Sequence, residues 1–244
     1  MKPELRSGLR SKLRAENLSV RYDADNEGCA LRGVTFSIRD GERAALLGAN
    51  GAGKSTLLMT LVGVLHPESG EVILDDAATT KETLRYLRSK VGVAFQNPDD
   101  QLFMPSLYED IAFGPRNYGL PEPEVESRVS AALSRLGISH LRERMTHRLS
   151  GGEKRLAALA GILVMEPSVL LMDEPTSFLD GRSRRRLIEI LSGLPQAMII
   201  ATHDIDLASK LCERVILLQN GQIRADGDAE TILSDAAMLD ACGL

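Results

Sequence analysis

The sequence predicts an α/β protein with a parallel sheet, an antiparallel β edge near the N-terminus and a helical subdomain inserted at about residues 97–166. Short β-rich runs recur along the chain and helical patterns separate several of them, which is the order expected of βα units. The later runs are apolar throughout, as strands buried on both faces of a parallel sheet are. The 244 residues are enough for a single domain with a substantial core.

Each element follows from a local pattern. Strands are expected at the runs rich in β-branched and aliphatic residues, at 17–22, 34–38, 44–48, 71–74, 91–95, 168–173, 197–202 and 214–218. Asn220-Gly221 predicts a tight hairpin after the last of these runs. One helix is expected where apolar residues share a face, at Val125, Val129, Leu133 and Leu136, and a second follows the "SGG" at 150–152.

Composition limits the setting in which the protein works. The net charge of −5 argues against nucleic acid as a partner, because nucleic acid usually requires a basic face. Basic residues do cluster at 1–15, and we interpret this stretch as an N-terminal arm without an assigned function. The three cysteines have no metal-ligand spacing and no apolar run has the length of a transmembrane helix. These features favour a reducing cytosol, and any work at a membrane would be done from one side.

The stretch "GANGAGKST" at 48–56 lies between a predicted strand and an apolar helical run, and it matches the pattern G-x-x-x-x-G-K-[ST]. Glycines allow a tight turn whose N–H groups point inward at an anion, and the helix start adds the positive end of its dipole. The Lys of such a loop reaches the β- and γ-phosphates and the hydroxyl ligates Mg²⁺. An ordinary glycine-rich turn is the alternative, but the context favours a nucleotide site. Its predicted binding residues are Gly48, Asn50, Gly51, Gly53, Lys54, Ser55 and Thr56.

Two acids and a histidine follow predicted strands. Asp173 and Glu174 end the run "VLLMDE", and His203 directly follows "AMIIAT". Open α/β sheets bind ligands at the carboxyl ends of their strands, where the loop at 48–56 also lies. We expect Asp173 to hold Mg²⁺ and Glu174 to accept a proton from the attacking water, or to orient it. Position alone leaves open a solvated helix cap for the acids and a capping role for His203.

A second glycine motif, "LSGGEKR" at 149–155, opens a predicted helix. Ser150 and Glu153 have the spacing of a capping box, which would explain them without a ligand. Gly151 and Gly152 at a helix start would also form a second anion site. One chain seldom needs two phosphate cradles for one nucleotide. Two chains arranged head to tail would each place the loop at 48–56 opposite the "SGG" of the other, with ATP between them.

With these motifs in this order, the chain resembles the ABC ATPase family over nearly its whole length. The resemblance implies a single ABC ATPase domain at 1–244. The stretch 48–55 resembles the Walker A motif, "VLLMDE" the Walker B motif and "LSGGE" the signature. The resemblance implies ATP and Mg²⁺ as cofactors and ATP hydrolysis as the activity. It also implies roles for single residues: Gln96 as the Q-loop residue at the metal and catalytic site, Tyr22 stacking on adenine, His203 contacting the γ-phosphate, and Asp180 of the D-loop "SFLD" at the dimer interface. By itself, Tyr22 would also pass for a strand-end tyrosine.

The stretch 91–120, which contains "FQNPDDQLFMP", is similar to the ATPase subunit of energy-coupling-factor (ECF) importers of cobalt, nickel or vitamins, especially the cobalt/nickel type. In that family, the segment after the Q-loop Gln borders the groove that receives coupling helices of the transmembrane scaffold. The resemblance therefore implies scaffold docking by Asp99, Asp100, Gln101, Leu102 and Phe103. The alternative is Asp99 or Asp100 as a helix N-cap, with Leu102 and Phe103 in the core.

The predicted function is ATP hydrolysis that drives solute import, at the cytoplasmic face of a prokaryotic membrane. The implied partners are a second ATPase chain (the same or a related one), an ECF-type scaffold and a substrate-binding membrane subunit, with no nucleic acid. Another type of ABC transporter is the main alternative, and a soluble ABC ATPase acting on nucleic acid or ribosomes is a further one. The chain departs from the wider family at Glu153, where Gln is commoner, at Phe178, where the residue is often small, and at Gly181, where Pro is frequent.

Overall fold

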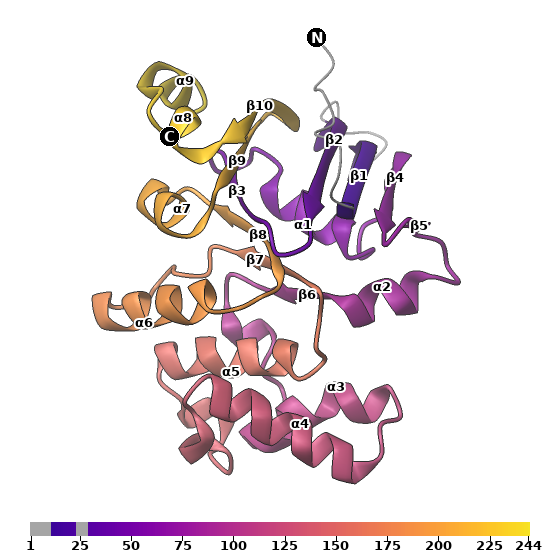
Figure 1. The fold of residues 1–244 in the computed structure, drawn as a ribbon, viewed down its shortest axis with the longest axis vertical. Coiled ribbons are helices and arrows are strands. Elements are labelled where there is room, and N and C mark those ends of the chain that lie inside the picture. Colours follow the sequence, from indigo (N-terminus) through magenta and orange to yellow (C-terminus); the bar gives the residue numbers. More distant parts are fainter. Residues whose placement is uncertain (1–10, 23–28) are drawn as a thin grey trace.

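The computed structural model describes residues 11–22 and 29–244. Its central sheet has the strand order β10-β9-β3-β8-β7-β6 (Figure 1). The strands are β3 (Arg43–Leu47), β6 (Val91–Ala94), β7 (Val169–Asp173), β8 (Ala197–Thr202), β9 (Arg214–Gln219) and β10 (Gln222–Asp228). All neighbours pair in parallel except β10, which pairs antiparallel with β9. The predicted α/β fold with a parallel sheet is therefore confirmed.

Alternate residues of the parallel strands enter two separate cores. In β3, Leu47 belongs to one hydrophobic cluster and Leu46 to the other, and Leu170 and Leu171 of β7 are divided in the same way. Strands that are apolar on both faces need cover on both faces. Helices supply it on one side, and α1 (Lys54–Leu61) with a second sheet supplies it on the other.

The N-terminal antiparallel structure is a separate four-stranded sheet with the order β2-β1-β4-β5. Its strands are β1 (Ser11–Val20), β2 (Leu31–Arg39), β4 (Ser69–Leu74) and β5 (Ala77–Ala78). β1 begins earlier than the strand predicted at 17–22, so residues 11–15 of the expected basic arm lie in a strand, where Lys12 pairs with Asp75 at 2.8 Å. Residues 1–10 of that arm lie outside the described ranges.

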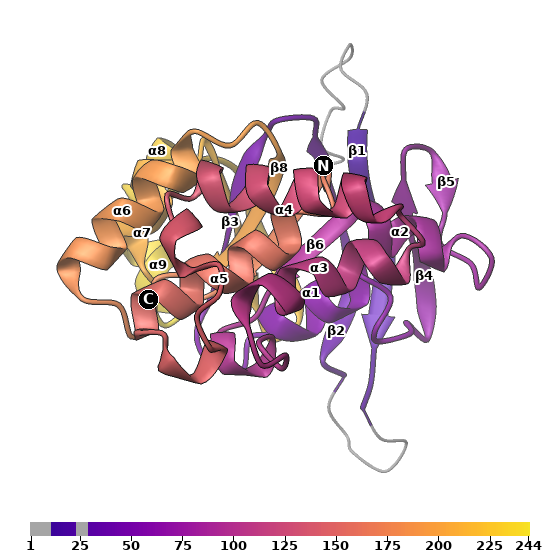
Figure 2. The same ribbon diagram turned by 90° about the horizontal axis from the view of Figure 1, so that it is seen from below.

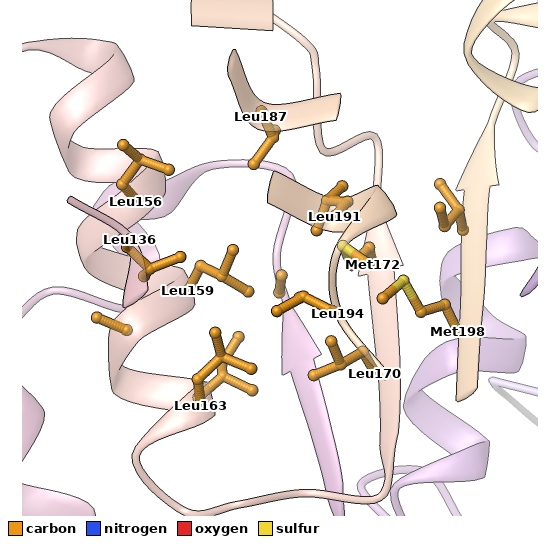
Figure 3. Close-up of a cluster of buried hydrophobic side chains, with 14 of the residues drawn as sticks. Leu136, Leu156, Leu159, Leu163, Leu170, Met172, Leu187, Leu191, Leu194 and Met198 are labelled. Atoms are coloured by element: carbon orange, nitrogen blue, oxygen red, sulfur yellow. The ribbon is translucent and has the colours of Figure 1, made fainter. Parts of the chain in front are cut away.

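Helices dominate the segment predicted as a helical subdomain (Figure 2). It contains α3 (Leu107–Asn117), α4 (Glu122–Arg135) and α5 (Gly151–Leu163), with short 3₁₀ turns at Pro98–Asp100, Ser139–Leu141 and Thr146–Arg148. Leu156, Leu159 and Leu163 of α5 extend into the core shared with β7 and α6 (Figure 3). The helical segment and the sheet therefore share one hydrophobic cluster.

The remaining helices are α2 (Leu84–Lys90), α6 (Gly181–Ser192), α7 (Ile205–Leu211), α8 (Ala229–Leu233) and α9 (Ala236–Ala241). The hairpin between β9 and β10 is confirmed, with φ of 49° at Asn220 and 73° at Gly221, as a tight turn of the mirror-image type requires. Within the part of the chain that the structure describes, no helix has the length and hydropathy needed to span a bilayer.

Candidate active site

The loop at 48–56, the phosphate loop, follows β3, runs into α1 and wraps around the side chain of Lys54. The Lys54 Nζ donates hydrogen bonds to the carbonyl oxygens of Gly48 (2.5 Å) and Ala49 (3.2 Å). A Cβ at Gly48 would collide with the carbonyl oxygen of Leu218, and Gly53 has a φ of 106°, so both positions require glycine. Burial disfavours the charged form of Lys54 and lowers its pKa. The loop thus holds a buried amine beside the N–H groups at the start of α1, a combination suited to phosphate.

Asp173 lies at the carboxyl end of β7, directly beside this loop. Its Oδ2 accepts a hydrogen bond from Ser55 Oγ at 2.6 Å, although the two residues are far apart in the sequence. The pKa of Asp173 is raised, mainly because burial disfavours the charged carboxylate. The sheet therefore places a hydroxyl and a buried acid together at the end of the phosphate loop.

Glu174 bridges from β7 to the end of β8. Its Oε1 accepts a hydrogen bond from the His203 backbone N–H at 3.0 Å and lies 2.6 Å from His203 Nδ1. Its Oε2 accepts from the Thr202 hydroxyl at 2.9 Å. Thr202 was not singled out in the sequence, because a threonine that ends a strand has no signal of its own. The acid and the histidine are thus held as a pair.

One cavity of about 380 Å³ brings most of the predicted nucleotide residues together. It is lined by residues of the phosphate loop, both acids, His203, Gln96 and Tyr22. The Tyr22 hydroxyl lies 2.8 Å from Thr56 Oγ1, and Tyr22 is 61% exposed, so a large part of this side chain is accessible beside the loop. An adjoining cavity shares Gln96 and Asp173 with this one and is also lined by Phe178.

The second glycine motif lies away from this cavity. Ser150 caps α5, and the predicted capping box is confirmed: Glu153 N donates to Ser150 Oγ (3.4 Å), and the Glu153 carboxylate accepts from Ser150 N (2.7 Å). The bond from the Ser150 backbone lowers the pKa of Glu153. Ser150 and Gly151 are exposed, and neither they nor Gly152 line the nucleotide cavity.

The D-loop lies beside the start of α5. Asp180 is the N-cap of α6 and accepts hydrogen bonds from Arg182 N (2.8 Å) and Ser183 N (3.0 Å). A Cβ on Gly152 would lie 2.7 Å from Ser183 Oγ, so the starts of α5 and α6 are in close contact. Phe178 has a φ of 63° and is 89% exposed.

The loop after β6 carries Gln96 and is held from two sides. The Gln101 amide accepts a hydrogen bond from Phe95 N (2.9 Å) and donates to the Val93 carbonyl (3.0 Å). Arg155 of α5 donates to the carbonyl oxygens of Phe95 (2.6 Å) and Gln96 (2.5 Å). The sequence analysis missed Arg155. The available signal was an arginine that lies four residues before Leu159, on the apolar face of the helix.

The five predicted docking residues lie in different environments. Phe103 is 63% exposed and its ring packs edge-on against Phe113, whereas Leu102 is partly buried against the main core. Gln101 uses its amide inside the chain, and Asp99 pairs with Lys154 at 2.6 Å. The alternative in which Asp99 or Asp100 is the N-cap is wrong. Asn97 caps the 3₁₀ turn by accepting a hydrogen bond from Asp99 N, because Pro98 fits the first position of the turn. The alternative of Phe103 in the core also fails on its exposure.

Comparison with known proteins places this site in a family. The ABC transporter family model matches residues 31–177, more than half of the chain. This chain belongs to that family. It is an ABC-type ATPase and an ATP-binding subunit of an ABC transporter.

Of three similar relatives, two carry more specific names. The energy-coupling factor transporter ATP-binding protein EcfA of Methanothermobacter thermautotrophicus is 46% identical over 86% of this chain and 69% of its own length. The cobalt import ATP-binding protein CbiO of Rhodobacter capsulatus is 47% identical over 88% of this chain and 79% of its own length. A putative ABC transporter ATP-binding protein of Geobacter sulfurreducens is 48% identical over 88% of this chain and 86% of its own length.

Two solved structures share the fold. CbiO1 of Clostridium perfringens, part of the ABC transporter complex CbiONQ, superposes with a TM-score of 0.83 at 39% identity and covers 92% of this chain and 91% of its own. The ATP-binding cassette MJ0796, a dimer in a post-hydrolysis state bound to ADP and Pi, has a TM-score of 0.79 at 25% identity and covers 89% and 98%. The resemblance to ABC ATPases of the ECF and cobalt type is therefore confirmed.

Proposed function

We propose that this chain hydrolyses ATP in a head-to-tail dimer and thereby drives solute import through an ECF-type membrane transporter. The observation that carries the chemistry is the convergence of Lys54, Asp173 and Glu174 in one cavity at the carboxyl ends of the parallel strands. Import is supported by relatives named EcfA and CbiO and by the structural neighbour CbiO1. The name of the Rhodobacter capsulatus relative, a cobalt import ATP-binding protein, favours cobalt as the solute, with nickel or a vitamin as the other candidates.

ATP would bind along the 380 Å³ cavity. Its adenine would stack on the exposed face of Tyr22, and its phosphates would accept hydrogen bonds from the N–H groups of the loop at 48–56. Lys54 would exchange its two backbone carbonyl partners for the β- and γ-phosphate oxygens. Binding an anion would favour the charged form of this amine, whose pKa burial lowers.

The donor atoms beside the phosphate loop fit a magnesium ion. A hydroxyl and a carboxylate meet where Ser55 Oγ donates to Asp173 Oδ2 at 2.6 Å, and Gln96 lines the same cavity. A few hard oxygen donors, shared with phosphate oxygens, suit Mg²⁺. When bound, Mg²⁺ would neutralise charge on the β- and γ-phosphates. Ser55, Asp173 and Gln96 are therefore the residues proposed to hold it.

Glu174 is positioned to act as the general base. Both of its carboxylate oxygens are fixed by hydrogen bonds from the end of β8. Glu174 would accept a proton from the water that attacks the γ-phosphorus, as the bond to the β-phosphate oxygen breaks and ADP leaves. His203 uses Nδ1 for Glu174, which leaves Nε2 for a γ-phosphate oxygen.

The signature residues would act on the nucleotide of the other chain. Ser150, Gly151 and Gly152 begin α5 but do not line the cavity of their own chain. The close contact of Gly152 with Ser183 brings the start of α5 beside α6, where Asp180 is also exposed. We therefore place Asp180 at the same interface. The dimeric neighbour of similar fold supports this arrangement, with a second copy or a related ATPase as the partner.

Scaffold docking would depend mainly on Phe103. It is the docking candidate with a large exposed apolar surface, and Phe113, 37% exposed, extends that surface. Leu102 would anchor the docking segment to the hydrophobic core. Gln101 and Asp99 would hold the same segment through their bonds to Val93 and Lys154. The chain would then lie peripherally at the cytoplasmic face of the membrane.

Two measurements test the proposal. The purified chain should hydrolyse ATP only with Mg²⁺. Coexpressed with the ECF-type scaffold and the substrate-binding subunit of its own genome and reconstituted in vesicles, it should support ATP-dependent uptake of Co²⁺, Ni²⁺ or a vitamin. Hydrolysis without uptake in such vesicles, combined with stimulation by another transporter's membrane subunits or by nucleic acid, would contradict the import function.

A further inference from the structure

Arg155 is a buried cation held by carbonyl groups alone. It is 3% exposed, and its two terminal nitrogens donate to the consecutive carbonyl oxygens of Phe95 (2.6 Å) and Gln96 (2.5 Å). Its Nε has no hydrogen-bond partner, and within residues 11–22 and 29–244 it makes no ion pair. Burial lowers its pKa. A buried charge without a carboxylate partner is costly.

Those contacts join two parts of the ATPase site. The carbonyls of Phe95 and Gln96 belong to the loop whose Gln96 side chain lines the nucleotide cavity. Arg155 itself lies in the first turns of α5, shortly after Ser150 and the two glycines of the signature. In the proposed dimer, the start of α5 faces the nucleotide of the other chain, whereas Gln96 faces the nucleotide of its own.

The linkage between helix and loop is stiff. The two terminal nitrogens of one planar guanidinium hold the carbonyl groups of the two peptide units on either side of the Gln96 Cα, and so fix the backbone of Gln96. Gln101 holds the N–H of Phe95 from the other side, at 2.9 Å. Lys154, the neighbour of Arg155, also contacts this loop through an ion pair with Asp99. That pair is solvent-accessible, and such pairs contribute little to stability.

We propose that Arg155 is a positioning residue for ATP hydrolysis. By holding the loop to α5, it makes Gln96 move together with that helix. The inference rests on the proposed function, because it takes Gln96 to act at the metal and γ-phosphate. When the nucleotide of the other chain binds Ser150, Gly151 and Gly152 at the start of α5, the contacts of Arg155 would then position Gln96 at the nucleotide of its own chain. Arg155 does not line the nucleotide cavity, so it would affect turnover and leave ATP affinity unchanged.

A double-mutant cycle tests this coupling. We would measure kcat for Mg-ATP hydrolysis, and the Kd for a fluorescent ATP analogue, in full-length wild type, Arg155→Lys, Gln96→Ala and the double variant. Lysine keeps the charge but cannot hold two carbonyls in one plane. A misplacement of about 1 Å lowers turnover by up to about 100-fold, so we expect Arg155→Lys to lower kcat by about 10- to 100-fold with the Kd within about twofold of wild type. Lys154→Met, the matched control, should stay within about twofold in both.

The double variant is decisive. If Arg155 acts through Gln96, adding Arg155→Lys to Gln96→Ala should lower kcat no further. A purely structural role for Arg155 would instead multiply the two losses, and that outcome would overturn the inference. So would an unchanged kcat in Gln96→Ala. If Arg155→Lys does not fold, Arg155→Gln, which keeps a neutral N–H donor, enters the same cycle. An inactive wild type would refute the proposed function itself, whereas an active wild type with multiplied losses would refute only the coupling.

Discussion

Replacing Phe103 with Ser should weaken binding to the transmembrane scaffold and leave the fold of the chain nearly unchanged. Burying a whole Phe side chain contributes about 1.5–3 kcal/mol, so covering the 63% of Phe103 that is exposed would contribute about 1–2 kcal/mol. That corresponds to an increase of roughly 5- to 30-fold in the Kd. The edge-on contact with Phe113 is the main internal contact at risk, and such ring pairs contribute about 0.5–1.5 kcal/mol.

The assay is a titration of purified variants against the detergent-solubilised scaffold, with a thermal melt of each variant. Leu102→Ser is the contrasting variant: Leu102 packs against the main core, so its loss should lower the free energy of unfolding by about 1–3 kcal/mol. Val64→Ser controls for the loss of an exposed apolar side chain, because Val64 is 55% exposed outside the docking segment. A wild-type Kd for Phe103→Ser would refute the docking role. A larger drop in Tm for Phe103→Ser than for Leu102→Ser would refute our account of both environments.

Three further predictions concern the catalytic base, backbone strain and pH. Glu174→Gln should lower kcat by about 10²–10⁴-fold in a steady-state ATPase assay with little change in ATP affinity, and near-normal turnover would remove Glu174 from its role. Phe178→Gly should raise the free energy of unfolding in urea by up to about 1 kcal/mol, because glycine adopts the φ of 63° without a Cβ penalty and the ring is 89% exposed; a loss of stability would contradict this. Burial raises the pKa of Asp110 in the folded protein above the unfolded value of 3.8. The protonated Asp110 therefore makes its full contribution to the free energy of unfolding below pH 3.8, and this contribution is lost as the pH rises through the folded pKa. Asp110→Asn keeps the oxygen that accepts from Phe103 N and Met104 N at 2.9 Å, so it should be more stable than wild type at pH 7 by chemical denaturation, with a difference that shrinks toward pH 3.8.

The parallel sheet and the phosphate loop were predictable because each depends on short-range patterns. An apolar run such as 197–201 can be buried on both faces only inside a covered sheet, and the structure shows these residues in β8. The positive φ at Gly53 is a local constraint, whereas a Cβ at Gly48 would collide with the carbonyl oxygen of Leu218, far away in the sequence, so that glycine was predicted only from the spacing of the motif. The capping box of Ser150 could be predicted because its two partners, Ser150 and Glu153, are only three residues apart.

The segment after β6 was less predictable, because three consecutive residues there meet three environments. Gln101 bonds backward to β6, Leu102 packs against the core and Phe103 points into solvent. A 3₁₀ turn followed by irregular backbone has neither a period of two nor one of 3.6 residues, so no pattern distinguishes the buried side chain from the exposed one. The cation that holds this loop is Arg155 of α5. Its place on the apolar face of the helix indicates burial, but nothing in either segment indicates which carbonyl groups it binds.

The turn after β7 explains how one sheet supplies two acids to one site. Consecutive residues of a strand point to opposite faces, so Asp173 and Glu174 could not both line the nucleotide cavity if β7 continued. β7 ends at Asp173, and Glu174 takes a φ of 43°, a conformation that non-glycine residues rarely adopt. Its N–H donates to the Ala201 carbonyl at 2.8 Å, and its carboxylate is held by Thr202 and His203. These buried bonds offset the strain and bring Glu174, the proposed general base, into the cavity that Asp173 also lines.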